Sequence, residues 1–402
     1  MLATVARHFE TGEWVRLTLQ DKVIESIQPW DGERSYEATD QWVAPAFWDI
    51  QTNGRWGISF SDPSLTVEQV IEVVLAQGDW GAARICPTLI TASPDDFLHG
   101  VSTIARACEI DPRVEACVLG IHLEGPFISE VDGYRGAHPL HAVRDPDWDL
   151  FQRFQEASGG RVVLITLAPE RAGSIEFIRK VVASGVVVAI GHTAADEPTI
   201  RAAADAGATL STHLGNGIAS NLSRHPNPIW AQAANDQLVA SLIADGHHLD
   251  ACSLRVLVRA KTPDRVILVS DASPLAALEP GPYGEWAVDP AGKIVVAGTP
   301  YLAGSNQGIE VGLNHLLQSV QLSLPQAIAT ATTHPARLLG RREPRLAAGE
   351  PANLVLFTRE GNAPTAPVQL RQTCVDGRWV EANQPGGGRG EANRSVQSSS
   401  NT

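Results

Sequence analysis

Carboxylate and imidazole side chains follow several of the short apolar runs in the chain. Glu124, His192 and His213 each come within two residues of the end of such a run. One carboxylate and two imidazoles suit zinc or a similar divalent cation and leave a position open for water. A single histidine of this kind is more often a polar residue satisfied by the backbone. Glu124, His192 and His213 together, in glycine-flanked positions at strand ends, favour a metal site.

Two further residues have the chemistry to move protons or stabilise charge. Asp271 follows the apolar run 266–270, where a carboxylate could accept a proton from water and return it to a leaving amine. An aspartate that caps the next helix is an equally good interpretation of this residue alone. His138 lies in a loop after Glu124, where an imidazole could bond a substrate carbonyl and stabilise an oxyanion. A surface-loop histidine is the alternative, and spacing does not separate the two.

A phosphate group would need a local positive site, because the chain has a formal net charge of −14. Arg224 and His248 could provide charge or donors, and Asn216 lies between Gly215 and Gly217, which would expose backbone N–H groups. Taken singly, Arg224 is more often a solvated surface arginine and His248 a helix-capping histidine. These residues therefore depend on the larger pattern for their interpretation.

The composition limits the class of protein. A hydrophobic fraction of 44% over 402 residues indicates a globular chain with room for one large and one smaller domain. The negative charge argues against a nucleic acid or an anionic membrane as partner. No apolar run approaches the roughly 20 residues of a membrane span, and the N-terminus lacks a signal peptide, so we expect a cytoplasmic protein. The five scattered cysteines, without a CxxC pair, predict reduced thiols.

The middle of the chain alternates short apolar runs with amphipathic stretches, a pattern typical of repeated βα units around a parallel sheet. The predicted strands are 44–50, 84–89, 118–123, 162–166, 186–190, 208–211, 238–243 and 266–270. An open doubly wound sheet has the same pattern. Reactive residues follow many of these strands rather than two, which favours an α/β fold of the (β/α)8 type, where the carboxyl ends of all strands meet.

Both ends of the chain have a different pattern. Residues 14–30 alternate apolar and polar side chains, and a similar alternation returns at 353–357 and 368–380, after a segment with a helical pattern at 324–339. We therefore expect a small β-sandwich domain from 1–43 plus 345–383, and a catalytic barrel from 44–344. The last segment, 384–402, has almost no apolar side chains and is expected to be a disordered tail.

An ordered series of motifs resembles the N-acetylglucosamine-6-phosphate deacetylase family of the amidohydrolase superfamily. The resemblance covers about 44–357. The motifs are Pro45-Ala-Phe-Trp-Asp-Ile-Gln-Thr-Asn-Gly54, Pro87-Thr-Leu-Ile-Thr91, Ile121-His-Leu-Glu-Gly-Pro-Phe127, Gly136-Ala-His138, Thr166-Leu-Ala-Pro-Glu170, Gly191-His-Thr193, Thr212-His-Leu-Gly-Asn216, Ala244-Asp-Gly-His-His248, Val269-Ser-Asp-Ala272 and Leu302-Ala-Gly-Ser305. Each is weak alone, but their order and spacing are specific.

The resemblance implies a (β/α)8 barrel with a small β-sandwich built from both chain ends, and it assigns roles to residues. Glu124, His192 and His213 would bind the metal, Asp271 would be the general base and acid, and His138 would polarise the amide carbonyl. The residues expected to bind substrate are Gln51, Asn53, Ala137, His138, Asn216, Gly217, Arg224, His248 and Leu302. Arg224 would reach into a neighbouring subunit's site, which implies a homodimer.

The first barrel strand departs from the superfamily pattern. Many amidohydrolases have His-x-His there and bind a second metal, whereas this chain has Gln51 and Asn53, and neutral amides are poorer ligands. We therefore expect one divalent metal per subunit, zinc first, with Fe2+, Co2+ and Mn2+ as alternatives. Ala46, Gly215 and Gly217 also differ from the family's usual residues, and these changes bear on the sugar pocket more than on the metal.

The resemblance implies metal-dependent hydrolysis of N-acetylglucosamine 6-phosphate to glucosamine 6-phosphate and acetate. A deacetylase for another N-acetyl sugar phosphate, such as the galactosamine epimer, or for another small amide is the nearest alternative, because epimers differ in one or two hydroxyl contacts. A non-catalytic barrel that binds an amino sugar phosphate is the alternative of another class. The presence of Asp271 with the three metal ligands argues against it, since a binding protein needs no base.

Overall fold

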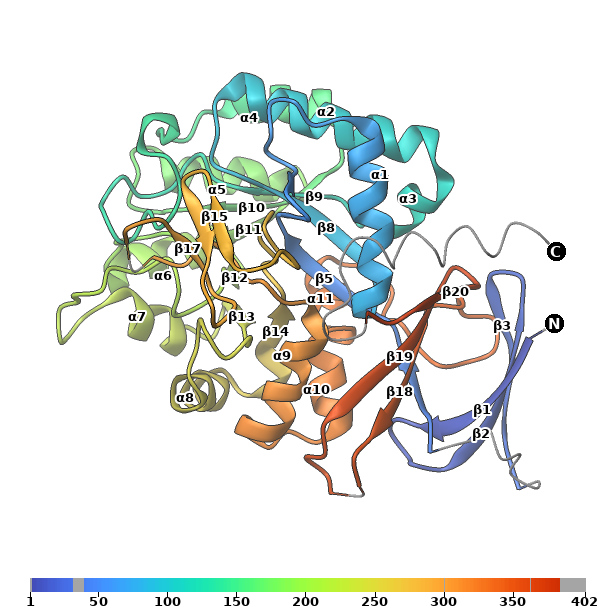
Figure 1. The fold of residues 1–402 in the computed structure, drawn as a ribbon. Helices are drawn as coiled ribbons and strands as arrows, with labels where there is room; N and C mark the ends of the chain where they lie inside the picture. The colour runs from blue at the N-terminus through green and yellow to red at the C-terminus, as the bar shows by residue number, and fades with distance from the viewer. Residues whose placement is uncertain (1, 32–39, 300, 362, 384–402) are drawn as a thin grey trace.

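Eight parallel strands form the central sheet of the protein (Figure 1). The computed structural model describes residues 2–31, 40–299, 301–361 and 363–383, so the predicted tail 384–402 lies outside the described residues. Each strand pairs with the next one along the chain. The strands are β5 (Phe47–Thr52), β8 (Ala82–Ile90), β9 (Ile121–Glu124), β10 (Val162–Leu167), β11 (Val187–Ile190), β12 (Leu210–Ser211), β13 (Val239–Ile243) and β14 (Val266–Val269).

The first and last strands of this sheet meet, which closes it into a barrel. The backbone N–H of Asp271 donates to the carbonyl of Gln51 over 2.9 Å, and that of Asn53 donates to the carbonyl of Ala272 over 2.8 Å. Apolar side chains fill the interior as in other small barrels, and the cluster comprises Ile50, Cys86, Leu164, Ala189, Leu210, Ile243, Ile267 and Val269. The predicted barrel is confirmed in preference to an open sheet.

Helices surround the barrel and bury one face against its strands. They are α1 (Val67–Ala76), α2 (Pro94–Ile110), α3 (Pro112–Cys117), α4 (Trp148–Ala157), α5 (Ser174–Ala183), α6 (Glu197–Asp205), α7 (Pro228–Ala234), α8 (Ala251–Lys261), α9 (Ile309–His315), α10 (Leu324–Thr330) and α11 (Thr333–Leu338). Capping residues set where several begin: the Thr66 hydroxyl accepts from the N–H of Gln69 before α1, and Asp250 caps α8. None of the helices among the described residues is long and apolar enough to span a membrane.

Strands from both chain ends form a separate seven-stranded sheet (Figure 1). Its order is β20 (Arg378–Glu381), β19 (Val368–Val375), β18 (Leu354–Arg359), β4 (Trp42–Pro45), β1 (Leu2–His8), β2 (Trp14–Gln20) and β3 (Val23–Pro29). Alternation in β18 explains how the sheet joins the barrel. Leu354 and Leu356 pack into the core of this sheet, whereas Val355 and Phe357 belong to the main core.

A three-stranded antiparallel sheet is inserted between the last barrel strand and α9. It comprises β15 (Gly281–Tyr283), β16 (Trp286–Val288) and β17 (Ile294–Val296). This sheet was not predicted from the sequence, because each of its strands is three residues long and too short to show a clear alternation. Trp286 of β16 lines the cavity at the mouth of the barrel, so this insertion forms part of the wall of the site.

A buried group of charged side chains lies beside the barrel. The Arg55 guanidinium is fully buried, stacks at 3.7 Å over the Trp80 ring and bonds Asp79 over 2.7 Å. Glu310, at the start of α9, is half-buried, and its buried Oε2 has no hydrogen-bond partner among the described residues. Burial raises the pKa of Glu310 to about 8, so this carboxyl is protonated at neutral pH.

Candidate functional site

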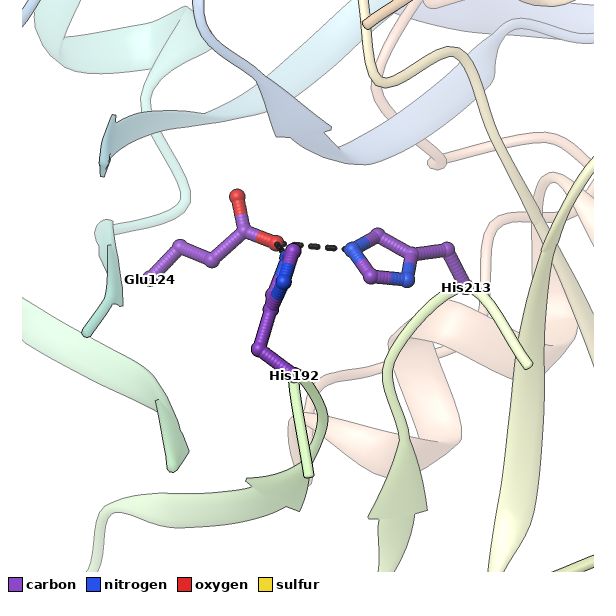
Figure 2. Close-up of side chains that lie close together, drawn as sticks. All are labelled: Glu124, His192 and His213. Carbon is purple, nitrogen blue, oxygen red and sulfur yellow. Dashed lines mark hydrogen bonds and ion pairs between the residues drawn. The ribbon is translucent and has the colours of Figure 1, made fainter. Parts of the chain in front are cut away.

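Four polar residues that are far apart in the sequence converge at the carboxyl ends of the barrel strands. Glu124 is the last residue of β9, and His192, His213 and Asp271 each come two residues after the end of a strand. All four line one cavity of about 330 Å3. Figure 2 shows Glu124, His192 and His213 pointing toward one another from their separate strand ends. The predicted metal ligands and the predicted base are therefore brought together by the fold.

The backbone is strained at three of these residues. His192, His213 and Asp271 have φ angles of +48°, +31° and +49°. Residues with a side chain adopt this left-handed conformation rarely, at a cost of about 1 to 3 kcal/mol each. Since the same unusual turn recurs after three different strands, we infer that it aims each side chain into the cavity and that this arrangement serves function rather than stability.

Glu124 is the centre of the possible metal ligand set. Its Oε1 lies 3.2 Å from Nε2 of His192 and 2.8 Å from Nε2 of His213, and all three side chains are buried. Burial by itself would raise the pKa of Glu124, but the hydrogen bonds from both histidines outweigh it and hold this pKa well below its usual range. The carboxylate therefore stays ionised, as a cation ligand must.

The donor set fits a divalent cation. Nδ1 of His192 lies 3.0 Å from the carbonyl oxygen of Tyr134, to which it donates. This contact fixes a proton on Nδ1, so Nε2, which faces Glu124, is the nitrogen that would bind a metal, a common arrangement around metal-binding histidines. Ligands placed about 2.1 Å from a tetrahedral zinc are about 3.4 Å apart. The observed separations from Glu124 are shorter than this by a few tenths of an ångström, so small side-chain shifts would admit the ion.

Asp271 is held by two side-chain amides. Asn53 donates to Asp271 Oδ1 over 2.7 Å, and Gln51 donates to the same oxygen over 3.2 Å and to Glu124 Oε1 over 3.0 Å. Burial and then the charge of Glu124 raise the pKa of Asp271 to about 6. A carboxylate of this basicity is suited to taking up and returning a proton near neutral pH.

His138 faces the same cavity from the loop after β9. Its ring is in edge contact with that of His192, with 4.2 Å between the ring centroids. Burial and then the charge of His192 hold the pKa of His138 well below its usual range, so the ring is neutral. A neutral imidazole in this position can donate one hydrogen bond to a bound carbonyl group.

Most residues expected to bind substrate line the cavity. They are Asn53, Ala137, His138, Asn216, Gly217, His248 and Leu302. Gln51 does not line the cavity and instead donates to the carboxylates of Glu124 and Asp271. That Gln51 and Asn53 touch the substrate stays a prediction. The Asn216 Nδ2 is buried without a partner among the described residues, so this amide is available to a ligand.

The close packing around the cavity explains one of the unusual residues. Gly217 has a φ of +60°, and a Cβ at this position would lie 2.8 Å from Nδ1 of His192. Alanine, the residue usual in the family at this position, would therefore need the His192 ring or the local backbone to shift in this chain. Glycine at this position lets the Asn216–Gly217 backbone approach the His192 ring closely.

Arg224 does not reach the cavity of its own chain. It is exposed and does not line the cavity. The adjacent helix α7 also exposes Trp230, whose relative exposure is 48%. Arginine and tryptophan are both enriched in protein–protein interfaces.

Some positioning residues were missed by sequence reasoning. Thr91 contacts Nδ1 of His138, Arg135 donates to the His138 carbonyl over 2.6 Å, and Asp245 bonds His248 Nδ1 over 2.8 Å. Thr91 directly follows β8, so the strand-end rule that selected Glu124 could have found it. The same rule places Asp245 after β13, although the sequence did not indicate that Asp245 orients His248. Arg135 carries no such signal, since its contact depends on the path of a loop.

Comparisons with known proteins agree with this geometry. Residues 42–380 match the model of the amidohydrolase family. The chain is 38% identical over 352 residues to the N-acetylglucosamine-6-phosphate deacetylase of Bos taurus, covering 84% of this chain and 83% of the relative. It is also 32% identical over 311 residues to an N-acetylgalactosamine-6-phosphate deacetylase of a Shewanella strain, covering 76% of each.

A solved structure with the same fold has been determined with a ligand. The N-acetyl-D-glucosamine-6-phosphate deacetylase of Mycobacterium smegmatis is 30% identical and superimposes with a TM-score of 0.84, covering 94% of this chain and all of that one. A variant of that protein, with a TM-score of 0.81 and 30% identity over 95% of this chain, was solved in complex with N-acetyl-D-glucosamine 6-phosphate.

Proposed function

The chain belongs to the amidohydrolase family and, within it, to the N-acetylglucosamine-6-phosphate deacetylases, and from this we propose that it hydrolyses N-acetylglucosamine 6-phosphate to glucosamine 6-phosphate and acetate. One observation carries the proposal. Glu124, His192, His213, Asp271 and His138, which come from five separate segments, line a single cavity. A site that only bound the sugar would have no use for a buried base beside a metal ligand set.

In the proposed mechanism Asp271 and His138 do the chemistry that belongs to the protein. Asp271 takes a proton from the water that attacks the acetyl carbonyl carbon, and His138 donates a hydrogen bond to the carbonyl oxygen as negative charge develops there. Asp271 then gives the proton to the sugar nitrogen as the C–N bond breaks, which releases acetate and the amine. A divalent cation held by Glu124, His192 and His213 would supply Lewis acidity to the carbonyl and lower the pKa of the water.

We infer one cation per subunit, with zinc as the first choice. Amidohydrolases are metal-dependent, and within the described parts of the chain a single buried cluster has suitable ligand types. The side-chain amides of Gln51 and Asn53 already donate hydrogen bonds to the carboxylates of Glu124 and Asp271. Amides are also weaker metal ligands than the histidines that many amidohydrolases have at these positions. Two nitrogens and one oxygen around an open position suit zinc, and metal analysis would distinguish it from Fe2+, Co2+ and Mn2+.

The sugar phosphate is proposed to contact Asn216, the Gly217 backbone and His248, with Ala137 and Leu302 as apolar walls. His248 is oriented by Asp245, whose pKa is lowered because hydrogen bonding to His248 outweighs the effect of burial. Arg224 is proposed to act in the site of a partner subunit, because it lies outside the cavity of its own chain. The enzyme is accordingly proposed to be a homodimer, with no nucleic acid or membrane partner.

The galactosamine epimer is the second candidate substrate. The Shewanella relative, 32% identical to this chain, is named for N-acetylgalactosamine 6-phosphate. The two sugars share the acetamide and the phosphate and differ only in the configuration of one hydroxyl. A pocket that binds the acetamide and the phosphate could therefore accept either sugar. Identity to the bovine relative is higher, at 38%, and favours the glucosamine substrate.

Two remaining proposals concern the whole chain. We keep 1–43 plus 345–383 as a small β-sandwich domain and 44–344 as the catalytic barrel, because the two sheets have separate cores. We also keep the cytoplasm as the expected location. The five cysteines are free thiols and four are buried, as is usual for proteins of reducing compartments.

The proposal is tested by acetate release from N-acetylglucosamine 6-phosphate, from its galactosamine epimer and from unphosphorylated N-acetylglucosamine. We expect chelator-sensitive turnover of the first, with kcat/KM at least about 100-fold lower for the unphosphorylated sugar, because charge-assisted bonds to the phosphate are lost. Faster turnover of the epimer would transfer the assignment to the second candidate. Bound metal without turnover of any of the three would contradict the proposed substrate class.

Replacing Arg224 with Ala is expected to raise KM for the phosphorylated sugar about tenfold and to leave the unphosphorylated sugar unaffected. The exposed Arg201, which pairs with Glu197 on α6, supplies the matched control Arg201→Ala. Mixing Arg224→Ala subunits with inactive Asp271→Asn subunits should restore turnover with the parental KM, since a hybrid dimer would contain one complete site. Failure of the mixture would place Arg224 in its own subunit's site or outside the mechanism.

A further inference from the structure

The imidazole of His138 is fixed on one side by Thr91, the residue directly after β8. The backbone N–H of Thr91 donates to His138 Nδ1 over 3.2 Å, and the Thr91 hydroxyl oxygen lies 2.8 Å from the same nitrogen. A backbone N–H can only donate, so Nδ1 must present a lone pair and cannot carry a proton. Because a neutral imidazole has one N–H, that proton lies on Nε2.

We propose that Thr91 selects the tautomer of His138 with its proton on Nε2 and thereby makes the ring a neutral hydrogen-bond donor toward the substrate carbonyl. The inference rests on the proposed function for the identity of that carbonyl. Thr91 is a positioning residue, since it touches His138 and does not line the cavity that contains Glu124 and Asp271.

The surroundings leave Nε2 free and restrain the rest of the residue. Arg135 holds the His138 carbonyl over 2.6 Å, so the backbone of the loop is fixed as well as the ring. Nε2 has no hydrogen-bond partner among the described residues, although the ring lines the cavity. A Cβ at Gly125 would lie 2.1 Å from the Thr91 hydroxyl oxygen, so glycine there leaves room for this contact.

The opposite tautomer would fail in two places. A proton on Nδ1 would face the Thr91 N–H at 3.2 Å, which sets two donors against each other. It would also turn the Nε2 lone pair toward the carbonyl oxygen, which becomes more negative as water attacks. The contribution of Thr91 should therefore appear in the transition state more than in substrate binding, and so in kcat rather than KM.

The tautomer can be read directly by 15N NMR of the zinc-loaded protein with 15N-labelled histidine rings, using His138→Gln to assign the signals. We expect His138 Nδ1 to have the chemical shift of an unprotonated nitrogen and Nε2 that of a protonated one. The reverse assignment would overturn the proposal. This measurement needs no substrate, so its outcome is independent of whether the proposed deacetylase activity is found.

Two variants test the role of the hydroxyl. Thr91→Val keeps the shape of the side chain and is expected to lower kcat about tenfold, with KM within about twofold, since it removes the hydroxyl that lies 2.8 Å from Nδ1 and 3.4 Å from the Glu124 carbonyl oxygen. Thr91→Ser should stay within about threefold of the parent in kcat, because it retains the hydroxyl. In Thr91→Val the Nδ1 signal of His138 should also move, and in Thr91→Ser it should not.

The matched control is Thr373→Val, which changes a fully buried threonine of β19 whose hydroxyl has no partner among the described residues. It should leave both the kinetics and the His138 signals unchanged. A Thr91→Val protein with unchanged kcat, or a loss that appears in KM and is not recovered by serine, would show that Thr91 only supports packing.

Discussion

Replacing Asp271 with Asn is expected to abolish turnover while the protein keeps its metal. Loss of a general base that also serves as the acid typically lowers kcat by about 100-fold to 10,000-fold, and we expect the upper part of that range because Asp271 is proposed to act in both steps. Acetate release measures the loss, and elemental analysis of the purified variant measures the metal. The two readouts separate the base from the ligands.

The structure explains why this substitution should leave the site intact. Asn53 and Gln51 both donate to Asp271 Oδ1, and an asparagine can present its carbonyl oxygen at that position. The cluster of Glu124, His192 and His213 does not include Asp271. The variant should therefore differ from the parent in its ability to accept a proton, and little else.

A buried carboxyl outside the site provides the control. Glu350 is buried and pairs with Arg342 at the edge of the small sheet, so Glu350→Gln makes the same chemical change far from the cavity. This control should keep parental turnover. Substantial activity in Asp271→Asn would remove Asp271 from the mechanism, and loss of metal in that variant would show that Asp271 belongs to the ligand set.

The barrel and its small companion sheet were predictable because their signals are local. Buried parallel strands read as short apolar runs, and alternation at residues 14–30 and 368–380 marked the sheet at the chain ends. The strands β1 (Leu2–His8) and β4 (Trp42–Pro45) were not singled out, and β15–β17 was missed entirely. These elements are short or partly exposed, so their pairing partners define them more than their own sequence does.

The reactive residues were predictable for a geometric reason. In a barrel the carboxyl ends of all strands meet at one face. Reactive residues at strand ends, namely Glu124, His192, His213 and Asp271, can therefore be selected without knowing any distance between them. Contacts between such residues were not predictable. The bond from Gln51 to Asp271 joins residues 220 positions apart, and only the closure of the barrel brings them together.

The positive φ angles at His192, His213 and Asp271 show where local sequence preference is overruled. Histidine and aspartate adopt this conformation more often than most residues with a side chain, but it is uncommon even for them, so residue preference alone does not predict it. The surrounding strands over-determine the backbone, so the strain is tolerated at the site. Such conflict between residue type and conformation is expected at functional positions.

Replacing Glu124 with Gln is expected to remove both the metal and the activity. The oxygen of Glu124 is shared by His192 and His213, and it is the single anionic ligand in the cluster. An amide offers no negative charge to balance a divalent cation, so we expect metal affinity to fall by at least about 100-fold, beyond what is usual for residues that only orient ligands. Competition with a chelator of known affinity measures the loss.

Glu310→Gln is the matched control, because Glu310 also has a buried carboxylate oxygen but lies outside the cavity. Burial raises the pKa of Glu310 to about 8, so glutamine mimics its protonated state and should leave metal content and turnover unchanged. Asp271→Asn and Glu124→Gln together separate the two roles. Asp271→Asn should lose turnover with the metal still bound, and Glu124→Gln should lose both the metal and turnover. If Glu124→Gln retained metal with parental affinity, the cation would have to be held by His192, His213 and a residue other than Glu124. The proposed position of the attacking water relative to Asp271 would then be wrong.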